Sequence, residues 1–268
     1  MKRRKFIKTA GVAGAGLVIV PGFAQETTTA VSLVGEDLDL YAVLDLFAES
    51  ETLEEFEKAL NNEDQGINNL DLNGNGEVEY IKVDEIVEEN THLIILQVEI
   101  EENEFQDVAT IEIEKKSDDD YTLQVIGAEE LYGENYIVEP ATDTSSTSTT
   151  VVHVHTYPVV VVMYSPVYTP WISPWRWGAR PIWWLPWRMV ARSAYRNRWA
   201  KSARRSRYRR TTKRRSTRGR NMYKSRKKTS NRYKKSTKSK KKQTTTTQKK
   251  KNTTTQKKKT TTQNKSTQ

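Results

Sequence analysis

The sequence contains no cysteine and only three histidines among its 268 residues. Disulfide bonds, catalytic thiolates, cysteine-ligated zinc and iron–sulfur clusters are therefore excluded. Acidic residues are absent from one part of the chain, because no Asp or Glu follows Asp143. Apolar residues make up only 35% of the chain, which is below the roughly 45–50% of ordinary globular domains. Part of the chain is therefore expected to lie outside any hydrophobic core.

Charge is divided unevenly along the chain. All 34 acidic residues lie between Glu26 and Asp143, and only four basic residues accompany them, so residues 25–143 carry a net charge of −30. The chain after residue 143 holds 35 Lys and Arg residues and no acid. Such an asymmetry indicates an acidic domain followed by a basic tail that binds a partner.

The first 24 residues have the composition of an export signal. A basic start (MKRRKFIK) precedes a short apolar run, and small residues end the segment before Gln25. The apolar run is too short to span a bilayer. The start resembles a twin-arginine signal, which implies a protein exported to the periplasm, the outer envelope or the extracellular space. An ordinary secretory signal would change the route but not the compartment. The residues that carry the resemblance are Arg3, Arg4, Phe6 and Lys8.

Residues 25–140 are predicted to form a folded acidic domain of the α+β class. Apolar residues at helical spacing, from Leu38 to Phe47, predict a first helix. Thr52 and Glu55 form a capping box that predicts the start of a second helix. We expect both helices to pack on one face of an antiparallel meander whose other face is acidic and exposed to solvent.

The apolar period changes from helical to alternating after the second helix, which predicts strands. Four runs follow this pattern, at residues 78–83, 92–100, 108–114 and 121–126. Short polar connections between them are typical of hairpin loops. Residues 129–140 are expected to add a turn and a short extended segment.

One loop of this domain has the residue types of a metal site. Residues 71–79 (DLNGNGEVE) place oxygen-bearing side chains at alternate positions and a glycine at the sharp turn, which suits calcium. The loop resembles those of EF-hands but has Lys82 at the twelfth position, so it is closer to shorter loops of extracellular repeats. A hairpin turn without metal fits the same residues. The predicted ligands are Asp71, Asn73, Asn75, Glu77 (through its carbonyl) and Glu79.

Residues 141–150 are predicted to be a Ser/Thr linker, and residues 151–200 an irregular strip rich in Val, Trp and Pro. Five prolines between residues 166 and 186 exclude a continuous helix or strand there. Trp and Arg together suit a membrane–water interface or stacking on sugars or bases. The alternative is that the strip folds back over the acidic domain. The strip residues predicted to contact a membrane or polymer are Trp171, Trp175, Trp177, Trp183, Trp184, Trp187 and Arg188.

Residues 201–268 are predicted to be a disordered basic tail, because they contain too few apolar side chains to offset the chain entropy. Such a chain condenses on polyanions by releasing counterions. The candidate partners are an anionic envelope polymer or lipid surface, nucleic acid, and the acidic domain of the same or a neighbouring chain. The tail residues predicted to make these contacts are Arg204, Arg205, Arg209, Arg210, Lys240, Lys241 and Lys242.

The order of these parts resembles a set of uncharacterised exported bacterial proteins with a small acidic domain and an aromatic, basic tail. The segments that carry this resemblance are residues 67–83, 103–115 and 131–140, and it implies no known activity. Common hydrolase and nucleotide-binding motifs are absent from the sequence. We therefore expect a non-enzymatic envelope or matrix protein with calcium as its one candidate cofactor and no small-molecule substrate. The alternative is a nucleic-acid-compacting protein.

Overall fold

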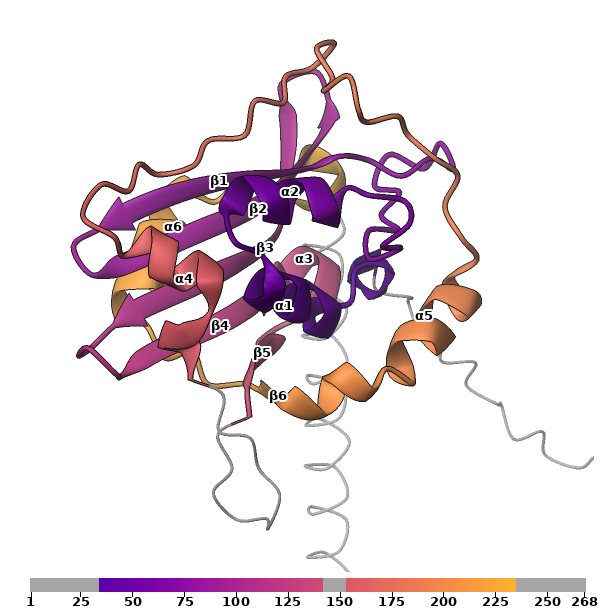
Figure 1. Cartoon of the computed structure of the whole chain (residues 1–268). Helices are drawn as coiled ribbons and strands as arrows, with labels where there is room; N and C mark the ends of the chain where they lie inside the picture. Colours follow the sequence, from indigo (N-terminus) through magenta and orange to yellow (C-terminus); the bar gives the residue numbers. More distant parts are fainter. Residues whose placement is uncertain (1–33, 142–152, 235–268) are drawn as a thin grey trace, which may run out of the picture. The chain divides into compact units, whose positions relative to one another are not determined.

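The computed structural model describes residues 34–141 and 153–234 (Figure 1). These residues form an α+β fold in which two N-terminal helices precede a six-stranded antiparallel sheet. The strands are neighbours in sequence order, from β1 to β6, so the predicted α+β class and meander are confirmed. Three predicted features lie outside the described residues: the export signal with Arg3, Arg4, Phe6 and Lys8, most of the linker, and the lysines Lys240, Lys241 and Lys242.

The N-terminal helices are capped as their sequences require. A 3-10 turn, η1 (Val34–Asp37), leads to α1 (Leu40–Glu49), and α2 (Leu53–Leu60) follows. The Asp39 carboxylate accepts bonds from the first N–H groups of α1, and the Thr52 hydroxyl accepts one from the Glu55 N–H at 3.1 Å. These side chains satisfy backbone donors that a helix start leaves unpaired. The predicted capping position of Thr52 is confirmed.

The strands are longer than the apolar runs that predicted them. They comprise β1 (Ile81–Glu88), β2 (Thr91–Glu101), β3 (Glu104–Lys115), β4 (Tyr121–Gly127) and β5 (Ile137–Pro140). A short helix, α3 (Glu129–Tyr132), precedes β5, as the expected turn and extended segment require. The first strand starts later than predicted. Val78 instead donates its N–H to the carbonyl of Trp187, 2.8 Å away in the aromatic strip.

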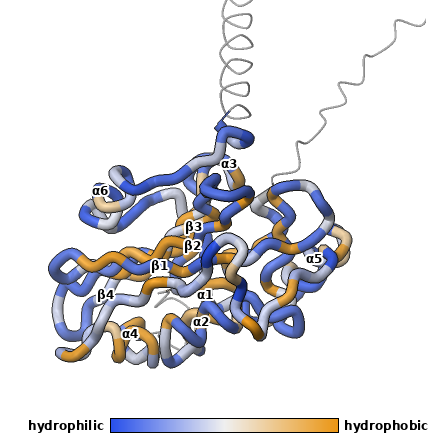
Figure 2. Tube along the Cα trace, turned by 90° about the horizontal axis from the view of Figure 1, so that it is seen from above, coloured by the Kyte–Doolittle hydropathy of each residue, from blue (hydrophilic) through white to orange (hydrophobic). Residues whose placement is uncertain are grey.

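Both faces of the sheet are covered. On one face, alternate residues of β2 such as Ile94 and Leu96 belong to the core beneath α1 and α2. On the other face, Leu93 and Ile95 pack against Met222 of α6 (Thr217–Arg226). Figure 2 shows the apolar strands lying between α6 on one side and α2 and α4 on the other. The expectation of a second face open to solvent is therefore wrong at the centre of the sheet.

The basic tail begins later than predicted. Residues 201–234 complete the fold through η3 (Ala203–Arg207), β6 (Tyr208–Thr211) and α6. Strand β6 pairs with β5 along its whole length, from Ile137 opposite Thr211 to Pro140 opposite Tyr208. Composition predicted disorder here because residues 201–234 have few apolar side chains of their own to bury. The acidic domain supplies an open strand edge and carboxylates that the tail uses to fold.

The strip between the two parts is partly regular. A 3-10 turn, η2 (Val154–Thr156), precedes α4 (Pro158–Met163), whose Val159, Val160 and Met163 enter the main core. Helix α5 (Arg192–Ala200) ends the strip. The strip thus folds back over the acidic domain, which was the alternative to an external partner. Among the described helices, none is long and apolar enough to cross a membrane.

Limited trypsin digestion of the full-length protein tests this revised boundary. Residues 201–234 contain 17 Lys and Arg residues, all of which would be cleaved rapidly in a disordered tail. Because folded segments resist proteolysis, we expect a stable fragment whose C-terminus lies near residue 234. Mass spectrometry of the fragment gives its end directly. Early cleavage between residues 204 and 215, without prior unfolding, would contradict the fold described here.

Candidate functional site

The second face of the sheet is held to the tail by a buried ion pair. Glu112 of β3 is 2% exposed, and Arg214 donates to both of its carboxylate oxygens, with the Nε bond at 3.0 Å. Burial raises the pKa of Glu112, and the hydrogen bonds and charge of Arg214 oppose that rise. A buried carboxylate without such a partner would be strongly destabilising. Because Arg214 pairs with Glu112, this face of the sheet can be covered although it carries a carboxylate.

A second ion pair joins β5 to β6 and the segment after it. Glu139 is nearly fully buried and accepts bonds from Arg215 at 2.7 Å and from Arg209 at 3.0 Å. Burial alone would raise the pKa of Glu139, but bonds from Arg215, Gln124 and Arg209 outweigh it and lower that pKa. Arg209, predicted as a polyanion contact, is thus a partner of the protein's own acidic domain.

The turn η3 docks on α1 in the same way. Asp45 is buried in α1, and it accepts bonds from Arg204 at 2.9 Å, from Arg207 at 3.2 Å and from the Tyr208 hydroxyl at 3.0 Å. Arg205 pairs with Asp39 at the start of the same helix. The predicted contact residues Arg204 and Arg205 therefore hold the tail on its own domain, which was one of the predicted partners.

The negative charge of residues 25–143 is largely neutralised by residues 144–234. Of the 35 basic residues after residue 143, 23 lie in residues 144–234 and reduce the net charge of −30 to −7 for residues 25–234. The remaining 12 lie in residues 235–268, which hold no acid. The uneven charge of the sequence thus persists as a weakly acidic body followed by a strongly basic end.

The aromatic strip docks through a buried carboxylate of α2. Glu57 accepts bonds from the Trp171 indole at 2.8 Å, the Ser173 hydroxyl at 2.6 Å and the Tyr80 hydroxyl at 2.7 Å. Burial raises the pKa of Glu57, while the bonds from Ser173, Tyr80 and Trp171 oppose that rise. Sequence reasoning did not single out Glu57. Its position four residues after Leu53, on the apolar side of α2, was the available signal.

Aromatic rings continue this contact. The Tyr80 ring stacks on Trp175 with centroids 4.6 Å apart and meets Trp184 edge-on at 5.2 Å. Trp175 and Trp184 are buried, whereas Trp177 and Trp183 are nearly half exposed. Of the six predicted tryptophans, Trp171, Trp175 and Trp184 therefore anchor the strip, whereas Trp177 and Trp183 face solvent. Trp171 and Trp187 are partly buried against the core, and Arg188 forms a backbone bridge to Glu77.

The side chains of the calcium-type loop accept hydrogen bonds from the backbone N–H groups of the same loop. Asp71 accepts three N–H bonds, from Gly74 at 2.6 Å, Gly76 at 2.9 Å and Asn75 at 3.1 Å. The Asn73 and Asn75 amide oxygens accept further N–H bonds two residues on, from Asn75 and Glu77. Gly76 adopts a φ of 84°, a conformation that glycine permits.

Glu79, at the ninth position, connects the end of the loop to its start. Its two oxygens accept N–H bonds from Leu72 at 2.7 Å and Asn73 at 2.9 Å. Burial raises the pKa of Glu79 to about 7, and these backbone bonds oppose that rise. The described residues contain no group of three or more acidic or histidine side chains arranged around a metal position. The hydrogen bonds of the loop are compatible with a metal-free turn, and calcium binding stays a prediction.

The structure brings the loop and the aromatic strip together, which the sequence did not indicate. Both line a cavity of about 250 Å³, near the lower end for small-molecule sites. Aromatic rings, amides, carboxylates and one guanidinium line it, together with the apolar side chains of Val78, Ile100 and Pro186. The side chains that carry these groups are Asn73, Asn75, Glu77, Glu79, Glu99, Tyr80, Trp175, Trp177, Arg180 and Trp184.

Comparison with known proteins adds no assignment. No protein-family model, no curated protein and no solved structure matches this chain significantly.

Replacing Arg214 with Gln tests the role of the buried ion pair. We expect a loss of about 3–5 kcal/mol of unfolding free energy, because Glu112 would remain buried without a cation. The raised folded-state pKa of Glu112 means that its contribution to stability is present below its unfolded pKa and lost as pH rises. Without Arg214 the rise in pKa is larger, so the loss should be greater at about pH 7.5 than at about pH 5.

Urea unfolding at both pH values measures this effect. The matched control is the double variant Glu112→Gln/Arg214→Gln, in which the buried charge is also removed. We expect the double variant to recover part of the lost stability and most of the pH dependence. Equal losses in the single and double variants would contradict a role for the uncompensated carboxylate.

Replacing Asp71 with Ala tests the loop. The variant removes the acceptor of three backbone N–H groups, so we expect a loss of about 1–2 kcal/mol in the presence of a chelator. Calcium titration by calorimetry, on the full-length protein and the variant, tests the predicted metal separately. Heat that disappears in the variant would support a calcium site, and unchanged stability would contradict the role of Asp71 in the turn.

Proposed function

We propose that this protein is an exported, non-enzymatic envelope protein that binds an anionic surface polymer or lipid surface. One observation carries the proposal: eight of the ten arginines in residues 192–215 pair with the protein's own carboxylates, whereas the 12 lysines after residue 234 have no acid near them in sequence. Uncompensated charge on this scale attracts polyanions by counterion release.

The different roles of the arginines before residue 216 and the lysines after residue 234 support this function. Arg204, Arg205 and Arg209 hold the tail on the domain through ion pairs with buried or half-buried carboxylates. The charge for an external partner is therefore assigned to the lysine blocks at residues 240–242, 249–251 and 257–259. Spaced lysine blocks suit a flexible, repeating anion rather than one fixed ligand.

The outer side of the aromatic strip supplies a second contact. Several large apolar side chains of the strip face solvent, as do the rings of Trp177 and Trp183. Exposed apolar groups close to arginines are typical of surfaces that meet a membrane or another macromolecule. These apolar side chains are Val167, Ile172, Ile182, Leu185 and Val190.

Export is part of the proposal, and it is supported by the resemblance of residues 1–24 to a twin-arginine signal. In the envelope, anionic lipids and acidic polymers are the available polyanions. A nucleic-acid partner is the competing possibility, since the same lysine blocks would neutralise phosphates. The binding experiment described next distinguishes an envelope polyanion from nucleic acid.

A full-length variant with the nine lysines of residues 240–242, 249–251 and 257–259 changed to Gln tests the proposal. We expect co-sedimentation with anionic vesicles or acidic polysaccharide to weaken strongly, with a shallower dependence of log affinity on log salt. The melting temperature should be unchanged, because the composition of residues 235–268 predicts a disordered tail that adds nothing to a hydrophobic core. Binding equal to that of the parent protein would contradict the proposal.

Control variants locate the contact. Arg218→Gln removes a half-buried cation of α6 that pairs with Glu89, Lys224→Gln removes an exposed one, and both variants should leave binding intact. Leu185→Asp places a charge on an exposed apolar position, and it should weaken vesicle binding without affecting stability. Tighter binding to double-stranded DNA than to every envelope polyanion at equal salt would favour the nucleic-acid alternative.

A further inference from the structure

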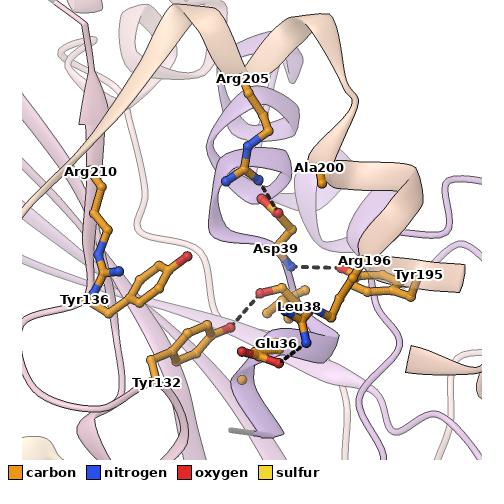
Figure 3. Close-up of a pocket in the computed structure, with 11 residues that line it drawn as sticks. Glu36, Leu38, Asp39, Tyr132, Tyr136, Tyr195, Arg196, Ala200, Arg205 and Arg210 are labelled. Carbon is orange, nitrogen blue, oxygen red and sulfur yellow. Dashed lines mark hydrogen bonds and ion pairs between the residues drawn. The ribbon is translucent and has the colours of Figure 1, made fainter. Parts of the chain in front are cut away.

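A second cavity, separate from the aromatic one, forms where the tail docks on the acidic domain. Its volume is about 350 Å³, and its walls come from η1, the start of α1, the segment from α3 to β5, α5, η3 and β6 (Figure 3). No single segment makes this cavity, because the acidic domain supplies one side and residues 195–210 the other.

The side chains that line this cavity include one more cation than anions. Arg196 pairs with Glu36 at 3.0 Å, and Arg205 pairs with Asp39. Arg210 has no acidic partner among the described residues, and its guanidinium lies 4.1 Å from the centroid of the Tyr136 ring. The lining therefore carries a net charge of +1, located at the exposed side chain of Arg210.

Two of the three tyrosine hydroxyls at the cavity are hydrogen-bonded to the protein, and one is not. The Tyr132 hydroxyl donates to the Leu38 carbonyl at 2.8 Å. The Tyr195 hydroxyl donates to the Ile67 carbonyl and accepts the Asp39 N–H. The Tyr136 hydroxyl has no partner in the described part of the chain and points into the cavity in Figure 3. Arg210 and Tyr136 thus place unused donors side by side.

The cavity is built on a fixed wall. The ring of Tyr132 lies against two glycines, and a Cβ at Gly35 or Gly127 would fall 2.7 or 2.6 Å from it. Asp39 is held by the first N–H groups of α1 and by Arg205. Because these groups are committed to the fold, the unused donors can act on a ligand without rearrangement of the wall.

We propose that this cavity binds the carboxylate of a sugar acid, either free or as a unit of an acidic polysaccharide. A guanidinium and a phenol are suited donors for a carboxylate, and a single negative charge balances the lining. The ring hydroxyls of the sugar would donate to Glu36 and Asp39, which border the cavity. The inference does not depend on the lysine blocks, so it can hold or fail separately from the proposed polymer binding.

Calorimetric titration of the full-length protein with sodium glucuronate at low ionic strength tests the inference. We expect binding of glucuronate and much weaker binding of glucose, which lacks the charge, and of acetate, which lacks the ring. Arg210→Gln should weaken binding at least roughly tenfold through loss of the charge-assisted bonds. Tyr136→Phe, which removes only the hydroxyl, should weaken binding by a smaller factor.

Stability controls keep the test informative. Arg210 has an exposed side chain, and its backbone pairing with Val138 does not require that side chain, so the variant should melt at the parent temperature. Arg218→Gln, on α6 and outside the cavity, should bind glucuronate normally, as should the nine-lysine variant. Equal binding of acetate and glucuronate, or equal effects of Arg210→Gln and Arg218→Gln, would overturn the inference.

Discussion

Neutralisation of buried carboxylates by arginines from the tail is the constraint on which the rest of the fold depends. Asp45, Glu112 and Glu139 are each at most 3% exposed, and each accepts bonds from arginines between residues 204 and 215. A carboxylate that loses its water without gaining a cation costs several kcal/mol. The acidic domain and residues 192–234 are therefore one folding unit, with β6 extending the sheet and α6 covering its second face.

The two kinds of basic residue are used differently along the chain. Arginines dominate the docked segments, where the planar guanidinium donates two parallel bonds to Glu112 and to Glu139. Lysines alone supply the charge of residues 235–268. A guanidinium fork suits a fixed, dehydrated carboxylate, whereas the hydrated ammonium of lysine suits diffuse attraction to a polyanion. The change from Arg to Lys marks the change from folding to proposed binding.

The local elements of this fold could be predicted from the sequence. Apolar spacing located α1 and α2, Thr52 marked a helix start, and alternation located four strands. The same alternation was misleading about Glu112, which lies between Ile111 and Ile113 and therefore on the opposite face of β3. Alternation shows that a face is polar, but it does not distinguish a face covered by water from one covered by a basic segment. The two cavities could not be predicted either, because each is lined by segments that lie far apart in the sequence.

The sequence by itself determined the α+β class, the order of the elements, the segregation of charge and the presence of an oxygen-rich loop and a tryptophan-rich strip. Only the tertiary structure decided that the strip folds inward and that Arg204, Arg205 and Arg209 serve the protein's own domain. It also decided that Arg210 and Tyr136 retain unused donors. Which carboxylate an arginine pairs with is decided in space, between residues that lie far apart in the sequence. Arg214 and Glu112, for example, are separated by 102 residues. Helical and strand periodicity report only on neighbours within a few residues.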